Sequence, residues 1–474
     1  MLLLVTGCVG HAERRTDPHD PRSAVTLQPD LTLVGAGDPL FPELGNGGYD
    51  ISHYDLDLNW APVGRTLSGT ASVTATAVRD LTSFDLDLSG LVVDRVSVNG
   101  KPARFARQRA ELVITPGAAL PSGSRFEAAV TYHGRPAALP YRGGRSTSAL
   151  GWQSSPRTTY TTQEPYGAHG WFPCSDHPSD KASYAIHVTA PSGLTVVSNG
   201  TRTERTTSGG VTRWGFDEPA PMATYLVTLA IGTYTVTTGS GPHGLPLTFA
   251  YFPADAATVV PLLEKSSTML SYFESRFGGY PFASYGVLVT DVADDETMET
   301  QTMVTMGRGL ATDTSTTYPK GFGESVLAHE LAHQWFGDAV TPVRWTDMWL
   351  NEGWAQYAQA MYEADVLGQP LAVKMEQYRL NDQRSRVRLG APGRPTALTV
   401  TGSQVYYGPA LMLNGLREQM GDTAFLAMAR AWVHDNLGTS RTRADFTGYV
   451  QRFAGRDMSA YISDWLDSTH QPAK

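Results

Sequence analysis

Residues 329–357 read HELAHQWFGDAVTPVRWTDMWLNEGWAQY. Positions i and i+4 of an α-helix lie on one face, so His329 and His333 can bind the same metal ion if their segment is helical. The apolar residues Leu327 and Leu331 recur at helical spacing around them. The segment therefore predicts a metal-binding helix, with a pair of core histidines as the alternative.

A third ligand is predicted further along the same stretch. A catalytic zinc ion usually has three protein ligands and keeps its fourth position for water. Glu352 lies near the start of a second predicted helix, with eighteen residues between it and His333. If the two helices pack antiparallel, His329, His333 and Glu352 form a donor set that suits one Zn²⁺ per chain better than iron or copper. The alternative for Glu352 is a carboxylate stabilised by the helix dipole.

Glu330 directly follows the first histidine, so it can reach a metal-bound water rather than the metal. The metal lowers the pKa of that water, and a neighbouring carboxylate can accept its proton while it attacks a carbonyl. We therefore predict metal-assisted amide hydrolysis with Glu330 as the general base. The alternative is an ordinary exposed helix residue.

The composition excludes several classes of protein. The 474 residues suggest two to four domains, and the net charge of −9 without a basic patch argues against nucleic-acid binding. No apolar run reaches the roughly 18 residues of a membrane span. Two cysteines cannot form a disulfide scaffold, and we expect Cys174 to be a buried small apolar residue.

The N-terminal residues suggest export. Residues 2–8 read LLLVTGC and resemble the end of a bacterial lipoprotein signal, which would make residues 1–8 a truncated signal with a lipidated Cys8. Residues 9–44 are polar and rich in proline, which predicts a disordered tether. We expect an exported protein, extracellular or attached to a membrane through Cys8. The alternative is a cytoplasmic protein whose terminal cysteine is incidental.

The rest of the chain divides into two predicted domains. Residues 45–240 alternate apolar and polar side chains, as in Tyr54-Asp55-Leu56, which is typical of half-buried antiparallel strands. Residues 241–474 mainly show helical spacing, with a strand near YGVLVTDV. We place a hinge at SGPHGLP, residues 240–246.

Together these motifs resemble the M1 aminopeptidases, the group of aminopeptidase N and leukotriene A4 hydrolase. Besides the zinc stretch, residues 164–182 are similar to the family's N-domain signature, residues 297–300 to its Gly-x-Met-Glu-Asn motif, and residues 405–407 to its catalytic tyrosine segment. The resemblance covers roughly residues 45–474. It implies an α+β multidomain fold, with an N-terminal antiparallel β-sandwich or saddle followed by a thermolysin-like, mainly helical zinc catalytic domain.

The resemblance also implies roles for individual residues. Glu299 would bind the free α-ammonium of a peptide, and Glu164 would reach in from the β domain to help. Tyr406 would donate its hydroxyl to the oxyanion, although the adjacent Tyr407 is an alternative. Met298 would line the pocket for the first side chain, or else pack in the core. The implied activity is an aminopeptidase whose partners are peptides with a free N-terminus.

An acidic segment surrounds the predicted ammonium site. Residues Asp291, Asp294, Asp295, Glu296 and Glu299 are all acidic, with no basic residue between them. This charge favours a cationic substrate terminus. For the three aspartates we expect only a solvated acidic loop.

Departures from the family pattern keep two alternatives open. Glu296 and Thr300 stand where the family has Gly and Asn, and the chain ends about 120 residues after Glu352, without the large helical C-terminal domain of many relatives. We expect a more open cleft. The alternatives are a zinc endopeptidase of the same fold and a catalytically silent binding module.

Overall fold

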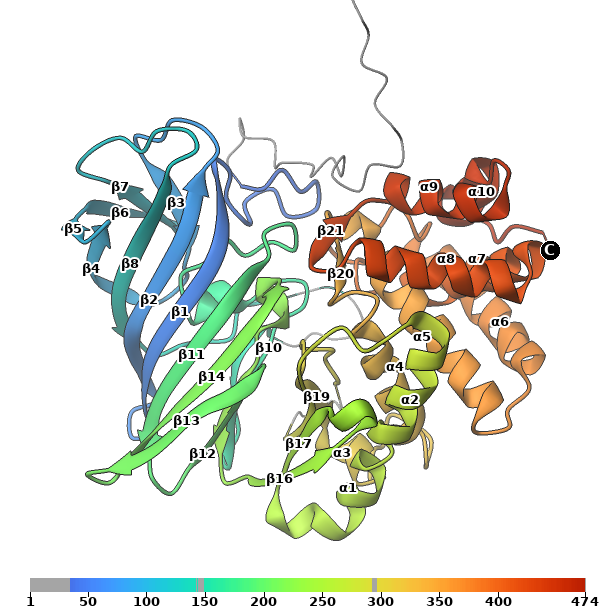
Figure 1. Ribbon diagram of the computed structural model, residues 1–474, viewed down its shortest axis with the longest axis horizontal. Coiled ribbons are helices and arrows are strands. Elements are labelled where there is room, and N and C mark those ends of the chain that lie inside the picture. Colours follow the sequence, from blue (N-terminus) through green and yellow to red (C-terminus); the bar gives the residue numbers. More distant parts are fainter. Residues whose placement is uncertain (1–34, 142, 144–148, 292–295, 474) are drawn as a thin grey trace, which may run out of the picture.

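The computed structural model describes residues 35–141, 143, 149–291 and 296–473. A β-rich first half lies beside a second half that is mainly helical (Figure 1). The α+β architecture expected from the sequence is therefore confirmed. No helix of the described residues is both long and apolar enough to cross a membrane.

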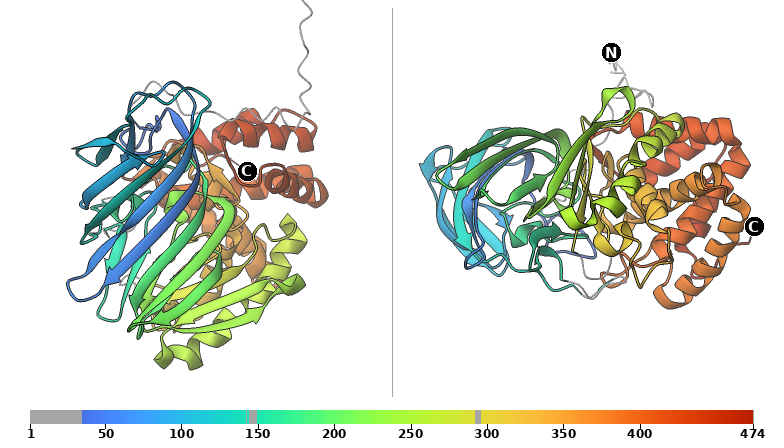
Figure 2. Two further views of the ribbon diagram at one scale, coloured as in Figure 1. Left: turned by 60° about the vertical axis from the view of Figure 1, so that its left-hand side comes forward. Right: turned by 90° about the horizontal axis from the view of Figure 1, so that it is seen from below.

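The β half is built around one long, curved sheet of eight strands (Figure 2). In spatial order its strands are β13 (Thr201–Ser208), β14 (Val211–Met222), β11 (Ala182–Pro191), β1 (Tyr49–Ala61), β2 (Thr66–Ala77), β8 (Arg125–Gly134), β4 (Val92–Val98) and β5 (Lys101–Pro102). In β1 and β11 buried and less buried residues alternate, because one face of the sheet covers the core. The pairing of β1 with β11 is parallel, whereas the other pairs in this sheet are antiparallel.

Two smaller antiparallel sheets complete this half. The first contains β3 (Phe84–Asp87), β7 (Glu111–Thr115) and β6 (Arg104–Gln108). The second contains β12 (Thr195–Ser198), β15 (Leu229–Gly232), β10 (Thr158–Thr162) and β9 (Gly151–Ser154). All five residues of β10 are buried, so this second sheet is an inner layer rather than a solvated surface.

The second half combines a four-stranded sheet with a group of helices. The sheet contains β16 (Thr235–Ser240), β17 (Pro246–Tyr251), β18 (Tyr285–Thr290) and β19 (Val304–Gly307), and β20 (Val340–Pro342) pairs with β21 (Thr439–Arg441). The helices are α1 (Ala256–Leu263), α2 (Ser266–Phe277), α3 (Arg308–Ala311), α4 (Gly323–His333), α5 (Trp349–Asp365), α6 (Leu371–Leu389), α7 (Gln404–Met420), α8 (Asp422–Asp435), α9 (Arg443–Ala454) and α10 (Ser459–Asp467). β18 is the strand that the sequence predicts near YGVLVTDV.

The change of architecture comes earlier than the sequence predicts. β16 pairs with β17 from Thr235↔Tyr251 to Ser240↔Pro246, so residues 235–240 belong to the sheet of the second half. Residues 240–246 form the tight turn of this hairpin rather than a hinge between domains. Their glycines and prolines reflect a turn, and those residue types do not distinguish a turn from a linker.

The predicted tether at residues 9–44 also needs correction. From Gly35 onward the chain is packed, and Asp38 is 1% exposed. Its Oδ2 accepts a hydrogen bond from the backbone NH of Trp345 at 2.8 Å and lies 3.3 Å from Nε2 of His177. Asp38 therefore connects residues of both halves. Residues 1–34, including the predicted signal and Cys8, lie outside the described residues, so lipidation stays a prediction.

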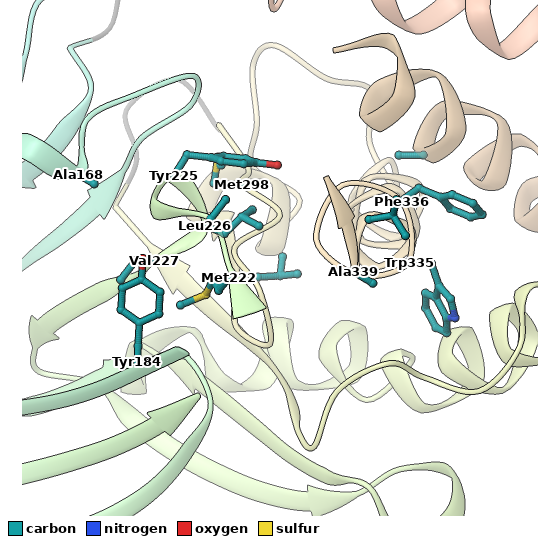
Figure 3. Close-up of a cluster of buried hydrophobic side chains, with 14 of the residues drawn as sticks. Ala168, Tyr184, Met222, Tyr225, Leu226, Val227, Met298, Trp335, Phe336 and Ala339 are labelled. Atoms are coloured by element: carbon teal, nitrogen blue, oxygen red, sulfur yellow. The ribbon is translucent and has the colours of Figure 1, made fainter. Parts of the chain in front are cut away.

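One continuous hydrophobic core joins the two halves. Tyr184, Met222 and Leu226 of the β half belong to the same cluster as Met298 and Phe336 of the helical half (Figure 3). Cys174 is fully buried within this core, as expected from the sequence. Because apolar burial is continuous across the boundary, it holds the halves in one relative position.

A buried ion pair connects α6 to the C-terminal helix. Arg386 and Asp382, on adjacent turns of α6, are almost completely buried, with Nε and Oδ2 2.8 Å apart. Arg386 also donates hydrogen bonds to the carbonyls of Trp465 and Ser468 at 2.8 and 2.6 Å. The guanidinium therefore both neutralises Asp382 and satisfies carbonyls at the end of α10.

We expect Arg386→Met to destabilise the chain by roughly 3–5 kcal/mol, because it leaves the Asp382 carboxylate buried without its cation. The matched control is Arg388→Met, an exposed position on α6 two residues beyond Arg386, which should change stability by less than about 0.5 kcal/mol. Urea unfolding followed by tryptophan fluorescence compares the two variants. Equal midpoints for both would contradict a stabilising role of the pair.

Candidate metal centre and active site

Two packed helices bring the three predicted ligands together. His329 and His333 lie on α4, and Glu352 lies in the first turn of α5. His329 Nε2 is 3.2 Å from Glu352 Oε2 and 3.2 Å from His333 Nε2, and His333 Nε2 is 3.5 Å from Glu352 Oε2. The three side chains are buried, and their donor atoms form a compact triangle.

The triangle has the dimensions of a zinc site. A tetrahedral ion with nitrogen and oxygen ligands at about 2.0–2.2 Å separates its ligand atoms by about 3.3–3.6 Å. The observed separations of 3.2, 3.2 and 3.5 Å fit this geometry. Two imidazoles and one carboxylate also match the donor chemistry that zinc prefers. The residues present therefore fit a Zn²⁺ ion.

A backbone carbonyl orients the second histidine. His333 Nδ1 lies 3.1 Å from the carbonyl oxygen of Phe336. Because a carbonyl only accepts, Nδ1 must carry the proton, which leaves the lone pair of Nε2 for a metal. Despite burial, hydrogen bonds with His329 and His333 hold the pKa of Glu352 well below its usual range, so this ligand is a carboxylate.

The negative charges around the three ligands favour binding of a cation. Burial disfavours a charged imidazole, yet the carboxylates of Glu299, Glu352 and Glu330 raise the pKa of His333 to about 10. A divalent cation between the same ligands would supply the positive charge in place of that proton. The electrostatic environment therefore agrees with the donor geometry.

Glu330 is held by a residue to which the sequence analysis assigned no role. The hydroxyl of Thr297 donates a hydrogen bond to Glu330 Oε1 at 2.5 Å. Burial raises the pKa of Glu330 to about 7, although this hydrogen bond opposes the rise. Thr297 occupies the variable position of the segment that resembles Gly-x-Met-Glu-Asn. A hydroxyl at this position is the one feature of the sequence that indicates a hydrogen bond to Glu330. It fixes one carboxylate oxygen and leaves the other for chemistry.

Glu299 and Glu164 form a second acidic pair beside the metal ligands. The Oε1 atoms of both residues are buried and have no hydrogen-bond partner among the described residues. Burial, and then the charge of Glu299, raise the pKa of Glu164 well above its usual range. Burial likewise raises the pKa of Glu299 to about 7. One unpartnered oxygen on each of these two buried acidic side chains provides a site that a cationic group would complete.

Both halves of the molecule hold the loop that carries Glu299. Gln334, which directly follows α4, donates to the carbonyl of Glu299 at 3.2 Å and accepts from the backbone NH of Thr302 at 2.9 Å. From the β half, Asn199 donates to the carbonyl of Gln301 at 2.6 Å, and Glu218 accepts from the hydroxyl of Thr302 at 3.0 Å. The position of Glu299 relative to α4 therefore depends on contacts with residues distant in the sequence.

The two adjacent tyrosines point to different neighbours. The ring of Tyr406 stacks against His329 with centroids 5.9 Å apart, whereas the ring of Tyr407 lies 5.3 Å from that of Tyr378 on α6. A Cβ on Gly353 would lie only 2.4 Å from Pro409 Cβ, so this glycine lets α7 approach α5 closely. The geometry thus brings Tyr406, and not Tyr407, next to a predicted metal ligand.

Met298 and Thr300, on either side of Glu299, are both buried. Met298 is 4% exposed and belongs to the core between the halves (Figure 3), as one of its two interpretations expects. The hydroxyl of Thr300, which replaces the amide of the family motif, donates to the carbonyl of Met303. Thr300 is fully buried, so this replacement is satisfied within the loop itself.

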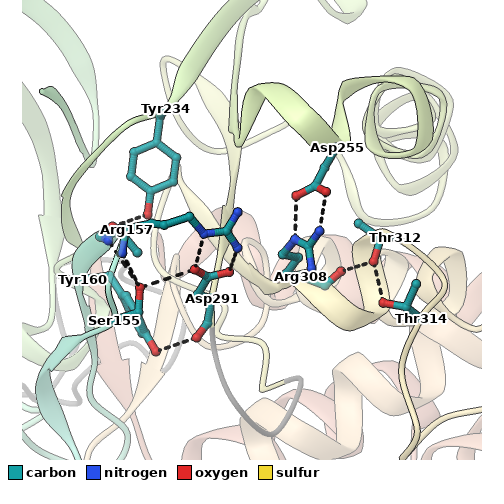
Figure 4. A network of polar contacts seen from close by, with 10 residues as sticks. Ser155, Arg157, Tyr160, Tyr234, Asp255, Asp291, Arg308, Thr312 and Thr314 are labelled. Atoms are coloured by element: carbon teal, nitrogen blue, oxygen red, sulfur yellow. Dashed lines mark hydrogen bonds and ion pairs between the residues drawn. The ribbon is translucent and has the colours of Figure 1, made fainter. Parts of the chain in front are cut away.

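The expectation that Asp291 is a solvated acid is wrong. Its carboxylate pairs with Arg157 of the β half at 2.9 Å from Nε and 2.5 Å from Nη2 (Figure 4). The guanidinium also lies 4.2 Å above the ring of Phe252. Asp291 thus anchors the end of β18 to the other half. Asp294 and Asp295 lie outside the described residues.

Comparisons with known proteins agree with this architecture. Residues 51–226 match the Peptidase M1 N-terminal domain, and residues 262–465 match the Peptidase family M1 domain. The crystal structure of an M1 zinc metallopeptidase from Deinococcus radiodurans is 29% identical, with a TM-score of 0.83 over 93% of this chain and 99% of that one. A mutant of that enzyme bound to the substrate Tyr-Ser-Ala is 30% identical over the same shares, also with a TM-score of 0.83.

Curated relatives are longer than this chain. Glutamyl aminopeptidase from Bitis rhinoceros is 26% identical over 329 residues, which are 66% of this chain and 34% of that protein. The chain thus spans about a third of the length of this relative. The similarity to the Deinococcus structures, by contrast, extends over almost their whole length.

We expect the purified chain to contain one zinc ion, and Glu352→Ala to lower the zinc content strongly because it removes one of three ligands. The control is Glu264→Gln, an exposed acidic position on the surface, which should keep the zinc. Elemental analysis by mass spectrometry measures the content. Chelation should lower the thermal midpoint of the parent chain but not of Glu352→Ala, since zinc stabilises only the state that binds it. Full zinc occupancy in Glu352→Ala would contradict the ligand set.

Proposed function

This chain belongs to peptidase family M1, and from that premise we propose that it is a zinc aminopeptidase that removes N-terminal amino acids from peptides. The observation that carries the proposal is the buried pair Glu164 and Glu299, whose unpartnered oxygens adjoin the metal ligands. The Deinococcus relative was crystallised with a tripeptide and with single amino acids, which supports peptides with a free N-terminus as substrates here.

The acidic pair selects the end of the peptide. The α-ammonium of a substrate would take the place between the carboxylates of Glu164 and Glu299 and satisfy their free oxygens. A peptide blocked at its N-terminus has no charge to offer, so it would leave two buried carboxylates unsatisfied. Binding of the terminus would then present the first peptide bond to the metal ligands. Selection for the free N-terminus therefore follows from charge rather than from side-chain shape.

Glu330 would act as the general base. When bound, zinc supplies a Lewis acid that lowers the pKa of a water molecule and polarises the substrate carbonyl. Glu330 accepts the proton of the attacking water and returns it to the amine that leaves as the C–N bond breaks. Thr297 holds one oxygen of this carboxylate, which leaves the other oxygen available to accept the proton. Burial of the base keeps competing solvent away.

Tyr406 would stabilise the developing negative charge. Its ring lies against His329, at the edge of the metal ligands. A hydroxyl directed at the carbonyl oxygen of the tetrahedral intermediate donates a hydrogen bond that strengthens as the charge develops. The contact of Tyr407 with Tyr378 on α6 supports Tyr406 rather than Tyr407 for this role.

A panel of free and N-acetylated peptides tests the proposal. We expect cleavage of a free tripeptide and of an amino-acid anilide, and no cleavage of the acetylated tripeptide. Glu330→Gln should lower kcat about 10²–10⁴-fold, since it removes a general base. Chromatography of the products gives the rates and the bond that is cut. Cleavage of the acetylated peptide alone would refute the aminopeptidase and favour an endopeptidase.

The controls separate chemistry from folding. Glu330→Gln should retain its zinc and its thermal midpoint, because glutamine has nearly the same shape. Glu264→Gln, at an exposed position, should keep the full rate. An unchanged rate in Glu330→Gln, or no hydrolysis by the zinc-loaded parent chain, would favour a catalytically silent module instead.

Thr297→Val should lower kcat about tenfold with little change in KM, because it removes a hydrogen bond to a carboxylate while keeping the shape of the side chain. Thr297→Ser, which keeps the hydroxyl, should recover most of the activity. Steady-state kinetics on the free tripeptide measure both values, and zinc content confirms an intact centre. Equal kcat for the valine and serine variants would show that the hydroxyl does not position Glu330.

A further inference from the structure

Exposed apolar side chains gather along α6. Ten large hydrophobic residues are exposed among those that the structure describes, and half of them lie between residues 366 and 398. Three of these are on α6 itself and are spaced by seven residues: Val373 is 54% exposed, Leu380 48% and Val387 85%. Single exposed apolar residues are ordinary, but a regular row of them marks an interaction surface.

The row occupies one face of the helix. Seven residues are nearly two helical turns, so Val373, Leu380 and Val387 lie one above the other. We call the exposed set Val373, Glu376, Gln377, Leu380, Gln383, Arg384 and Val387 the outer stripe. The opposite face of α6 is buried and includes Met375, Tyr378, Asp382 and Arg386. The outer stripe is therefore exposed to solvent, and α6 itself lies at the edge of the helical half that is far from the β half (Figures 1 and 2).

The outer stripe is complementary to itself. If a second copy of α6 lies antiparallel across it with the two-fold axis at Leu380, residues at equal distances from Leu380 face each other. Val373 then faces Val387 of the second copy, Leu380 faces its own equivalent, and Glu376 faces Arg384 of the second copy. Each apolar contact and each charge pair occurs twice, as a two-fold interface requires.

The charges of the outer stripe also disfavour a parallel arrangement of the two helices. In a parallel arrangement Glu376 would face Glu376 and Arg384 would face Arg384, which places like charges together. Within the described residues neither side chain has an ion-pair or hydrogen-bond partner, so both remain available to a second copy. We propose that the outer stripe of α6 is the interface of an antiparallel, two-fold symmetric homodimer.

The interface would be modest in strength and would leave the site open. α6 is 19 residues long, about 28 Å. Two crossing helices of this length bury less surface than a standard interface of about 1,600 Å². The dimer should therefore be weak and reversible, and the fraction of dimer should increase with protein concentration. The inner face of α6 packs on α7, where Tyr407 meets Tyr378. The second copy therefore docks on the side of α6 opposite to the helix that carries Tyr406.

Sedimentation velocity of the full chain across roughly a hundredfold range of concentration tests the dimer. The parent chain should shift from monomer to dimer. Leu380→Glu should remain monomeric, because the two-fold axis brings the two introduced charges together. Val63→Glu, at a 93% exposed position between β1 and β2, is the matched control and should dimerise like the parent chain. At the lowest concentration, where all three chains are monomeric, their thermal midpoints should be equal, since both sites are exposed.

A charge exchange tests the pairing itself. Glu376→Arg and Arg384→Glu should each weaken dimerisation about tenfold, because each substitution turns two attractive contacts into repulsive ones. The double variant should recover the parent affinity. Single variants that dimerise like the parent chain, or a double variant that stays as weak as the singles, would overturn the pairing.

Cysteine cross-linking tests the orientation, in a chain whose Cys8 is replaced by serine and whose remaining Cys174 is buried. A mixture of Val373→Cys and Val387→Cys chains should form the mixed disulfide, and Val373→Cys alone should not. Cross-linking of Val373→Cys with itself would overturn the antiparallel arrangement.

A chain that stays monomeric at all concentrations, or a dimer unaffected by Leu380→Glu, would overturn the proposal. A monomer that binds phosphatidylcholine vesicles through Leu380 would assign the stripe to a membrane instead.

Discussion

The convergence of two imidazoles and one carboxylate is the constraint on which the rest of the structure depends. Donor atoms 3.2–3.5 Å apart, in a buried site with further carboxylates around it, are compatible only with a positive charge between them. Helices α4 and α5 must therefore pack closely and in one register. Trp354 of α5 stacks on Phe336, which follows the end of α4, and this apolar contact keeps the two helices in register. Packing of the hydrophobic core therefore fixes the positions of the three metal ligands.

Neither half of the molecule completes the site alone. The metal ligands come from two helices of the second half, while Glu164 comes from the β half. The loop of Glu299 is tied to Asn199 and Glu218 across the boundary, and Arg157 fixes the end of β18 through Asp291. A continuous core and these polar ties hold the two halves as one unit. The proposed recognition of a substrate terminus at a set distance from the metal would depend on such rigidity.

The errors of the sequence interpretation share one cause. Asp291 was expected to be solvated, residues 35–44 to be a tether, and residues 240–246 to be a hinge. In each case the composition describes local preference and does not identify the partner, which is Arg157 for Asp291 and Trp345 for Asp38, both distant in the chain, and the adjacent strand β17 for β16. Polar and turn-forming residues look the same whether they are solvated or satisfied by a distant group. The hydroxyl of Thr297 likewise shows no local preference for Glu330, because the two residues meet only in the folded chain.

The sequence by itself determined the alternating strands, the helix that carries His329 and His333, and the presence of a carboxylate at a family-specific distance. The strands and the helix follow from spacing within one or two turns of a single element, which backbone geometry dictates, whereas the carboxylate follows from the family pattern. Only the tertiary structure decided that Tyr406 rather than Tyr407 meets His329, that Thr297 holds Glu330, and that α6 presents its apolar row to solvent. Those outcomes depend on which elements pack against each other, because a side chain acquires its neighbours through long-range contacts that local spacing does not encode.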